Sequence, residues 1–321
     1  MKKSLALLCA ISMLAATSCT APEKSSKEIT SVEIKTTESK TKSIELSSDD
    51  APTTAQTQQE TSSEKETETE TEAAKEKAHL DEQLIWEFDN VKVYAKGIEY
   101  GWAGPEIKLL VENNSNKDIS IYTDYVIIND FMVSDLSAIE VTAGNKTTDS
   151  IYILNDYIEK SKIDEIGKIE LSFHAREEGS YDILAESELI AMYTSDYDES
   201  ATTPVFEGET LVDRDSVKIV GLGVSEDSPL SAEIILYIEN NTGKTISVYN
   251  DDFAVNGFMQ TSFFGCEIAA GKKIVTDIDV LKSQLEENGI NSIDNVELSF
   301  RVRQGDYDVL FETDKINFKV K

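Results

Sequence analysis

One segment of the chain occurs twice, and this internal repeat limits the folds that the chain can adopt. Residues 107–173 align with residues 234–300 at a constant spacing of 127 without a gap, and 26 of the 67 paired positions are identical. Two unrelated segments of similar composition would share far fewer residues. The chain is therefore two copies of one module behind a leader and a linker, and its 321 residues have room for two domains of ordinary size.

The leader has the pattern of a bacterial export signal. Two lysines follow Met1, and residues 4–14 form an apolar run that is too short to span a bilayer as a stable helix. The sequence Leu-Ala-Ala-Thr-Ser-Cys then ends at Cys19, and small residues ahead of a cysteine resemble a bacterial lipobox. The resemblance implies cleavage after Ser18 and lipidation of Cys19, although Ala16 stands where leucine is commoner. An ordinary signal peptide, cleaved near residues 15–18, is the alternative.

The segment after the leader has the composition of a disordered tether. It is rich in Ser, Thr, Glu and Lys and contains almost no large apolar residue before Leu80, so it cannot bury enough apolar surface to offset its ordering entropy. The resulting division is a signal peptide (1–18), a tether (19–83), a first module (84–194), a connector (195–204) and a second module (205–321).

Within the modules, the hydrophobic pattern predicts short strands separated by polar turns. Apolar and polar residues alternate in segments such as 91–98, 106–111, 119–122, 125–129 and 169–173, with turn signals about every ten residues. Each module also carries one helical segment. In the second copy Asp279 reads as its N-cap, with Val280, Leu281 and Leu285 on one face and Asn288-Gly289 as its end. The sequence predicts an all-β chain of two tandem β-sandwich modules, each with one short helix; a small barrel is the alternative.

Three motifs recur in both copies and carry a resemblance to a known class of domain. They are Glu-Asn-Asn-Ser/Thr (112–115 and 239–242), Asn129 and Asn256 with a following Phe-Met, and Ala-Gly-x-Lys (143–146 and 270–273). The chain resembles surface lipoproteins of Gram-positive bacteria, especially anaerobic Firmicutes, that carry tandem immunoglobulin-like extracellular domains of unknown function. The resemblance implies immunoglobulin-like sandwiches on the outer face of the cytoplasmic membrane, anchored through Cys19. The motifs are structural turns, so no catalytic residue can be carried over.

The formal net charge of -31 restricts the partners. Most of the excess acid lies after residue 80, on the modules themselves. Such a surface repels phosphate backbones and anionic head groups, which argues against nucleic acid as a ligand. A protein or glycan ligand of unknown identity stays open, and the membrane is contacted through lipidated Cys19.

The chain lacks the residue patterns of catalysis and of zinc binding. It holds two histidines, His79 and His174. The two modules contain one cysteine between them, Cys266 of the second, and the equivalent position of the first module is Ile139. Cys266 therefore reads as a small core residue. With no Cys/His cluster, nucleophile elbow or phosphate-binding loop, we expect neither an enzyme nor a cofactor.

Calcium is the one metal that the residue pattern suggests, and only weakly. Asp124 and Asn129 recur as Asp251 and Asn256, and oxygen ligands in loops suit Ca²⁺. No twelve-residue calcium loop is present, however, so these residues can equally serve turns.

The sequence thus favours a lipid-anchored extracellular binding or adhesion protein of unknown ligand. The alternative is a structural spacer or an accessory subunit of a cell-envelope complex. Exposed aromatic side chains such as Tyr122, Tyr249, Phe263 and Phe264 are candidate contacts, although most aromatics in a sandwich belong to the core. An exposed apolar patch on either module would favour binding over a spacer.

Overall fold

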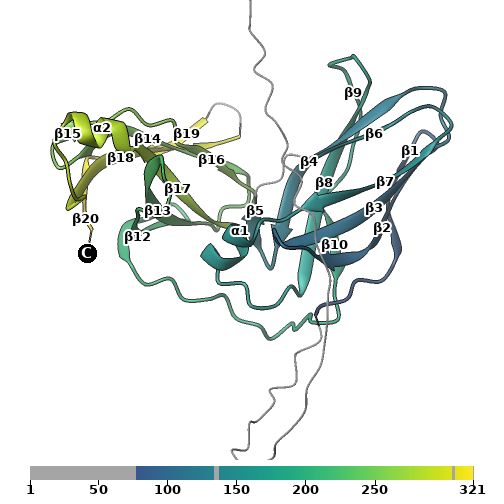
Figure 1. Ribbon diagram of the computed structural model, residues 1–321, viewed down its shortest axis with the longest axis horizontal. Coiled ribbons are helices and arrows are strands. Elements are labelled where there is room, and N and C mark those ends of the chain that lie inside the picture. Colours follow the sequence, from purple (N-terminus) through teal and green to yellow (C-terminus); the bar gives the residue numbers. More distant parts are fainter. Residues whose placement is uncertain (1–76, 134–136, 306–307, 321) are drawn as a thin grey trace, which may run out of the picture. The chain divides into compact units, whose positions relative to one another are not determined.

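A computed structural model of the chain describes residues 77–133, 137–305 and 308–320 (Figure 1). All of them belong to a compact unit that spans residues 71–321. The signal peptide, Cys19 and all but the last residues of the expected tether lie outside the described residues. Among the residues that are described, no helix combines the length and the apolar character needed to cross a bilayer.

The first module consists of ten strands and one short helix: β1 (Gln83–Phe88), β2 (Val91–Tyr100), β3 (Pro105–Asn113), β4 (Ile119–Ile128), β5 (Phe131–Val133), β6 (Ala138–Val141), β7 (Lys146–Tyr152), α1 (Asn155–Lys160), β8 (Lys168–Glu177), β9 (Ile183–Glu186) and β10 (Ile190–Tyr193).

The second module repeats these elements in the same order: β11 (Glu209–Arg214), β12 (Val217–Ser225), β13 (Ser231–Asn240), β14 (Ile246–Val255), β15 (Phe258–Met259), β16 (Gly265–Ile268), β17 (Lys273–Leu281), α2 (Lys282–Glu287), β18 (Asn295–Gln304), β19 (Asp308–Glu312) and β20 (Ile316–Lys319).

Strand register is the same in both copies. Ile119 of β4 lies opposite Glu177 of β8, and 127 residues later Ile246 of β14 lies opposite Gln304 of β18. A one-residue slip in register would move every side chain of a strand to the other face, so the repeat preserves the faces of the sheets as well as their topology.

Each module is a sandwich of two sheets with immunoglobulin-like connectivity. In the first module β1, β2, β3 and β7 form one sheet, while β8 and β4 form the centre of the other, flanked by β9 and β10 on one side and by β5 and β6 on the opposite side. The chain crosses between sheets from β3 to β4, from β6 to β7 and again from β7 to β8, which is a Greek-key path. The predicted all-β sandwich with one short helix per module is confirmed.

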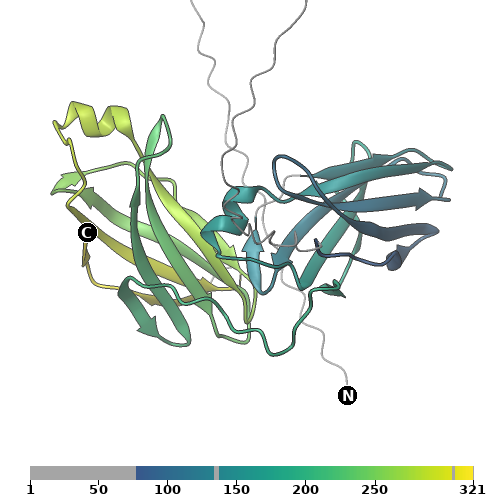
Figure 2. The same ribbon diagram turned by 60° about the horizontal axis from the view of Figure 1, so that its bottom comes forward.

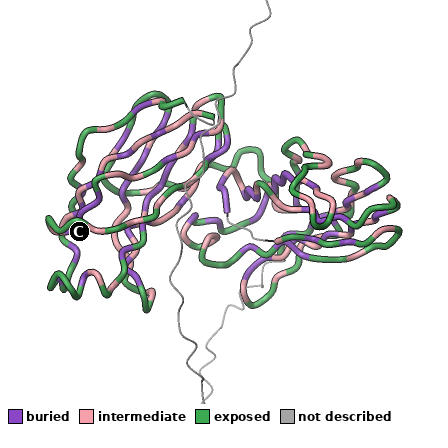
Figure 3. Tube along the Cα trace, turned by 90° about the horizontal axis from the view of Figure 1, so that it is seen from above, coloured by how far each residue is buried: buried purple, intermediate pink, exposed green. Residues whose placement is uncertain are grey.

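Alternating side chains of both sheets build the core of each sandwich, as the alternation of buried and exposed positions along the strands in Figure 3 shows. The core of the first module joins Ile107 and Leu109 of β3 to Leu171 and Phe173 of β8. The second core is made in the same way from β13, β14 and β18. The period-two pattern of the sequence therefore identifies the buried faces correctly.

The repeated Glu-Asn-Asn-Ser/Thr motif folds around a buried asparagine. The Asn240 side-chain amide donates to the Lys244 carbonyl oxygen at 2.9 Å and to the Ile268 carbonyl oxygen at 2.9 Å, while its Oδ1 accepts from the Thr242 N–H at 3.0 Å. Asn113 makes the matching bonds in the first module. A short amide side chain thus satisfies backbone groups that the turn leaves unpaired, which explains the motif without a ligand.

Two local expectations are wrong. Residues 119–122 and 125–129 do not form separate strands: β4 runs continuously from Ile119 to Ile128 and absorbs the polar residues Thr123 and Asp124 at a bulge. Asp279 is not a helix N-cap, because β17 extends through it and α2 begins at Lys282. Pairing with β13 keeps Asp279 extended, opposite Glu233. The expected end of the helix at Asn288-Gly289 is correct.

Candidate functional site

The two modules are joined by the short strand β5. It pairs with β4 of its own module and, at its other edge, with β17 of the second module, so that one sheet runs through both modules. The Lys273 N–H donates to the Asp130 carbonyl oxygen at 3.0 Å. Figure 2 shows β5 and α1 between the other strands of the two modules. The connection is therefore a shared backbone edge in addition to the covalent connector.

Apolar side chains of β5 fill the junction. The Phe131 ring lies 5.8 Å from the Phe206 ring and 6.4 Å from the Tyr237 ring, centroid to centroid. Met132 Sδ accepts the Ala269 N–H at 3.2 Å. Phe131 is 1% exposed and Met132 is 9% exposed, so both are as buried as core residues, although they lie at the end of a hairpin. Their burial contributes on the order of 2 kcal/mol each.

A buried ion cluster lies beside these apolar side chains. Lys272 Nζ, from the second module, lies 2.5 Å from Glu170 Oε2 and 2.8 Å from Asp130 Oδ1. Lys168 Nζ lies 2.6 Å from the same Asp130 oxygen. Burial opposes ionisation of Asp130, but the hydrogen bonds and charges of the two lysines outweigh it and lower its pKa to about 2. The two acids and two lysines therefore balance each other across the junction.

A second ion cluster connects α1 to the sheet of the second module. Lys160 Nζ lies 3.1 Å from Glu233 Oε2, 3.4 Å from Asp277 Oδ2 and 3.0 Å from Asp156 Oδ2. Burial opposes protonation of Lys160, yet these carboxylates raise its pKa overall. Burial also raises the pKa of Asp277. The two clusters and β5 therefore connect the modules through both side chains and backbone.

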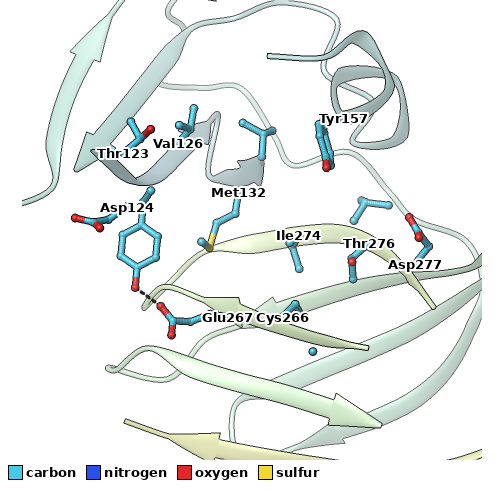
Figure 4. Close-up of a pocket in the computed structure, with 14 residues that line it drawn as sticks. Thr123, Asp124, Val126, Met132, Tyr157, Cys266, Glu267, Ile274, Thr276 and Asp277 are labelled. Atoms are coloured by element: carbon cyan, nitrogen blue, oxygen red, sulfur yellow. Dashed lines mark hydrogen bonds between the residues drawn. The ribbon is translucent and has the colours of Figure 1, made fainter. Parts of the chain in front are cut away.

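A cleft of about 430 Å³, open to solvent, lies at the junction and is lined by residues of both modules. Figure 4 shows Met132 and Tyr157 from the first module opposite Glu267 and Asp277 from the second, while the Asp124 carboxylate points away from them. A volume of this order is typical of a small-molecule site, and such sites often lie between domains. No lysine or arginine is among its described lining residues, so the cleft is acidic.

The carboxylates of the cleft are each engaged by a protein group. Glu267 accepts the hydroxyl of Tyr125, Asp124 lies 2.6 Å from His174 Nδ1, and Asp277 pairs with Lys160. Burial, reinforced by Glu267, raises the pKa of Tyr125 to about 12. A ligand that bound these carboxylates would share them with Tyr125, His174 and Lys160.

Cys266 and His174 do not form reactive groups. Cys266 packs against the core of the second module, and burial raises the pKa of its thiol to about 12, so it stays protonated at neutral pH. His174 stacks on Tyr122 with ring centroids 5.0 Å apart. In the second module Arg301 takes the place of His174 and donates to Asp251, so the position holds a hydrogen-bonding partner for an aspartate in both copies.

The four calcium candidates are used in four separate local interactions. Asp124 bonds to His174, and Asp251 bonds to Arg301 at 2.7 Å. Asn129 and Asn256 each bind the loop that precedes the strand after the helix: Asn129 Oδ1 accepts the Gly167 and Lys168 N–H groups, and Asn256 Oδ1 accepts those of Asp294 and Asn295. Among the described residues, no three acids, histidines or cysteines are placed to hold a metal ion. The calcium hypothesis stays a prediction without structural support.

The aromatic candidates differ from one another. Phe263 is 97% exposed and Tyr249 is 37% exposed, while Tyr122 and Phe264 are half-buried. Sequence reasoning missed Phe258 and Met259, which are 47% and 65% exposed. They align with Phe131 and Met132, so the repeated Phe-Met pair is the sequence feature that could have pointed to them. An alignment alone cannot show that one pair is buried and the other exposed.

Comparisons with known proteins identify no family. No protein-family model matches the chain, and no curated protein matches it. Among solved structures, the chain is similar to the Salmonella enterica SafA pilin in complex with the SafB chaperone, at 14% identity, 73% coverage of this chain, 98% of that chain and a TM-score of 0.23. It is also similar to a protein of unknown function from Porphyromonas gingivalis W83, at 11% identity, with 68% and 90% coverage and a TM-score of 0.21.

Proposed function

We propose that the chain is a lipid-anchored extracellular protein that binds an unidentified protein or glycan through its second module. The observation that carries the proposal is the exposure of Phe258, Met259 and Phe263. The first two have the same sequence as Phe131 and Met132, which are buried against a neighbouring module. Exposed apolar side chains are often found at interaction sites.

The anchoring part of the proposal rests on the sequence of the leader. The lipobox-like residues before Cys19, followed by a polar tether, support an anchor on the outer face of the membrane. Replacing Cys19 by alanine should move the mature protein from the detergent-rich to the aqueous phase on temperature-induced separation. An unchanged distribution would contradict lipidation of this cysteine.

Binding can be tested with a matched pair of full-length variants. Phe258→Ser/Met259→Ser/Phe263→Ser removes the exposed apolar side chains, and Trp102→Ser removes an aromatic that is 96% exposed on the first module. Wild type and the Trp102 variant should capture the same saturable component from cell-envelope protein and glycan fractions, and the triple variant should not. Equal capture by all three proteins would refute this site.

The stiff junction favours one alternative, a structural spacer. A sheet that continues through β5 into β17, together with the ion pairs of Lys272 and Lys160, suits a rigid element. A spacer would tolerate the triple serine substitution without loss of any partner, while breaking the junction at Lys272 would impair it. We propose no catalytic activity, since His174 is hydrogen-bonded to Asp124 and Cys266 packs against the core of the second module.

A further inference from the structure

The exposed strand β15 presents the same surface that β5 uses inside the molecule. In the first module, Met132 of β5 lies opposite Ile127 of β4, which lies opposite Glu170 of β8. In the second module, Met259 of β15 lies opposite Ala254, which lies opposite Glu297. The two rows contain the same methionine and the same glutamate at corresponding places. Among the described strands, only β5 of the first row is paired with a strand of the other module.

The molecule itself shows what covers a surface of this kind. The β5 surface is covered by β17, which begins at Lys273, and by Lys272, which precedes it. Lys272 neutralises the buried Glu170, while Lys273 donates its backbone N–H to Asp130 and holds its ammonium group 5.8 Å from the centre of the Phe131 ring. A strand edge supplies the main-chain pairing, and its basic side chains supply the charge.

The second module has lost the lysines that accompany this surface in the first. Lys160, Lys162 and Lys168 of the first module correspond to Glu287, Gly289 and Asn295. Tyr125 corresponds to Asp252, which is exposed. Glu297 keeps one partner, Lys315 at 3.2 Å, in a half-exposed pair. The positions equivalent to these lysines therefore carry less positive charge in the second module, which favours a basic occupant at Phe258 and Met259.

We propose that β15 of the second module binds the edge strand of a β-sheet in a separate protein, and that this strand carries lysine or arginine as β17 does. The proposal rests on the proposed binding function and names its partner class and docking mode. The partner strand adds to the free edge of β15, packs on Phe258 and Met259, and places its cations near Glu297 and Asp252.

A second copy of this chain is a poorer occupant. The edge that corresponds to β17 in the first module is β7, which pairs only with β3 among the described strands. It keeps a lysine at Lys146 but has Asn145 where β17 is preceded by Lys272, and Thr148 where β17 has Val275. Two chains of net charge -31 also repel each other.

The probe for this surface is a synthetic peptide with the sequence of residues 269–281, which is the edge strand that covers the equivalent surface of the first module. Its binding to the full-length chain is measured by fluorescence anisotropy of the labelled peptide. The control peptide carries Lys272→Glu and Lys273→Glu. The chain variants are Phe258→Ser/Met259→Ser and, as a matched exposed aromatic, Trp102→Ser.

We expect saturable binding of the peptide to the wild type. The affinity should fall at least tenfold with the charge-reversed peptide, with the double serine variant and at high salt. Trp102→Ser should leave the affinity unchanged. Equal binding by wild type and the serine variant would place the peptide elsewhere, for example on β5, and would overturn the proposal. Absence of saturable binding to the wild type would overturn it as well.

Two further measurements separate the possible failures. Sedimentation velocity of the full-length chain over a range of concentrations should show a monomer; self-association that Phe258→Ser/Met259→Ser abolishes would assign the surface to a second copy and overturn the proposal. If envelope capture depends on the apolar side chains while the peptide does not bind, the strand-addition mode is wrong and the proposed function stands.

Discussion

Removing Lys272 tests whether the buried ion cluster holds the modules together. The Lys272→Met substitution keeps most of the side-chain volume but leaves Glu170, whose side chain is 10% exposed, with Lys168 at 3.3 Å as its remaining ion-pair partner. Removing one partner of a buried ion pair costs about 3–5 kcal/mol. Because Lys168 still compensates part of the charge, we expect the lower end, about 3 kcal/mol of unfolding free energy.

The assay is equilibrium unfolding of the full-length chain in guanidinium chloride, followed by circular dichroism. The matched control is Lys117→Met, which removes a lysine that lies 2.7 Å from Glu177 with both side chains about half exposed. Exposed pairs contribute little, so this control should lose less than about 1 kcal/mol. Adding Glu170→Gln to Lys272→Met should recover part of the loss, because it removes the carboxylate left without its main partner.

A loss for Lys272→Met that is no larger than the loss for Lys117→Met would refute the reasoning. It would mean either that water enters the junction and solvates Glu170 or that the modules separate at little cost. Failure of Glu170→Gln to recover stability would show that the loss comes from packing and not from charge.

Three other predictions follow from local contacts. Asn240→Ala and Asn113→Ala should each destabilise the chain by about 2–3 kcal/mol in the same unfolding assay, because each leaves buried carbonyl groups without a donor. Asp130, whose folded pKa of about 2 lies below the usual 3.8, should contribute stability at neutral pH that is lost as the pH falls from about 4 to 2. The shift alone corresponds to about 2.4 kcal/mol, but the side chain is 37% exposed, so we expect about 1 kcal/mol after screening. Millimolar calcium should not raise the melting temperature, because Asp251 is already bound to an arginine.

Each of these has an outcome that would contradict it. Alanine at either asparagine with no loss of stability would mean that water replaces the amide. An Asp130→Asn variant with the same acid unfolding profile as wild type would remove Asp130 from the explanation. A calcium-dependent rise in melting temperature that Asp251→Ala abolishes would restore the calcium hypothesis.

Much of the fold follows from local sequence. The alternation in residues 106–111 predicts the buried face of β3, and the polar motif at 239–242 predicts the turn that Asn240 organises. These features depend on neighbours within a few residues, so they can be read from one chain. Strand ends and the start of α2 were harder, because pairing with β13 overrides the capping preference of Asp279.

The candidate site was less accessible to sequence reasoning. Lys272 and Glu170 are about a hundred positions apart and carry no shared motif, so their pairing depends on how the modules meet. The cleft beside Met132 has the same origin, since its walls come from both modules. Asp124 and Asp251 were grouped as possible ligands by their recurrence, whereas the fold gives each its own side-chain partner, His174 and Arg301.

The sequence by itself determined that the chain contains two copies of one module, with the same turns and the same Phe-Met pair after an asparagine. Only the tertiary structure decided that Phe131 and Met132 are buried while Phe258 and Met259 are exposed. The physical reason is that burial at the end of a hairpin depends on a second surface. β17 supplies that surface to the first pair, and among the described residues no strand supplies it to the second.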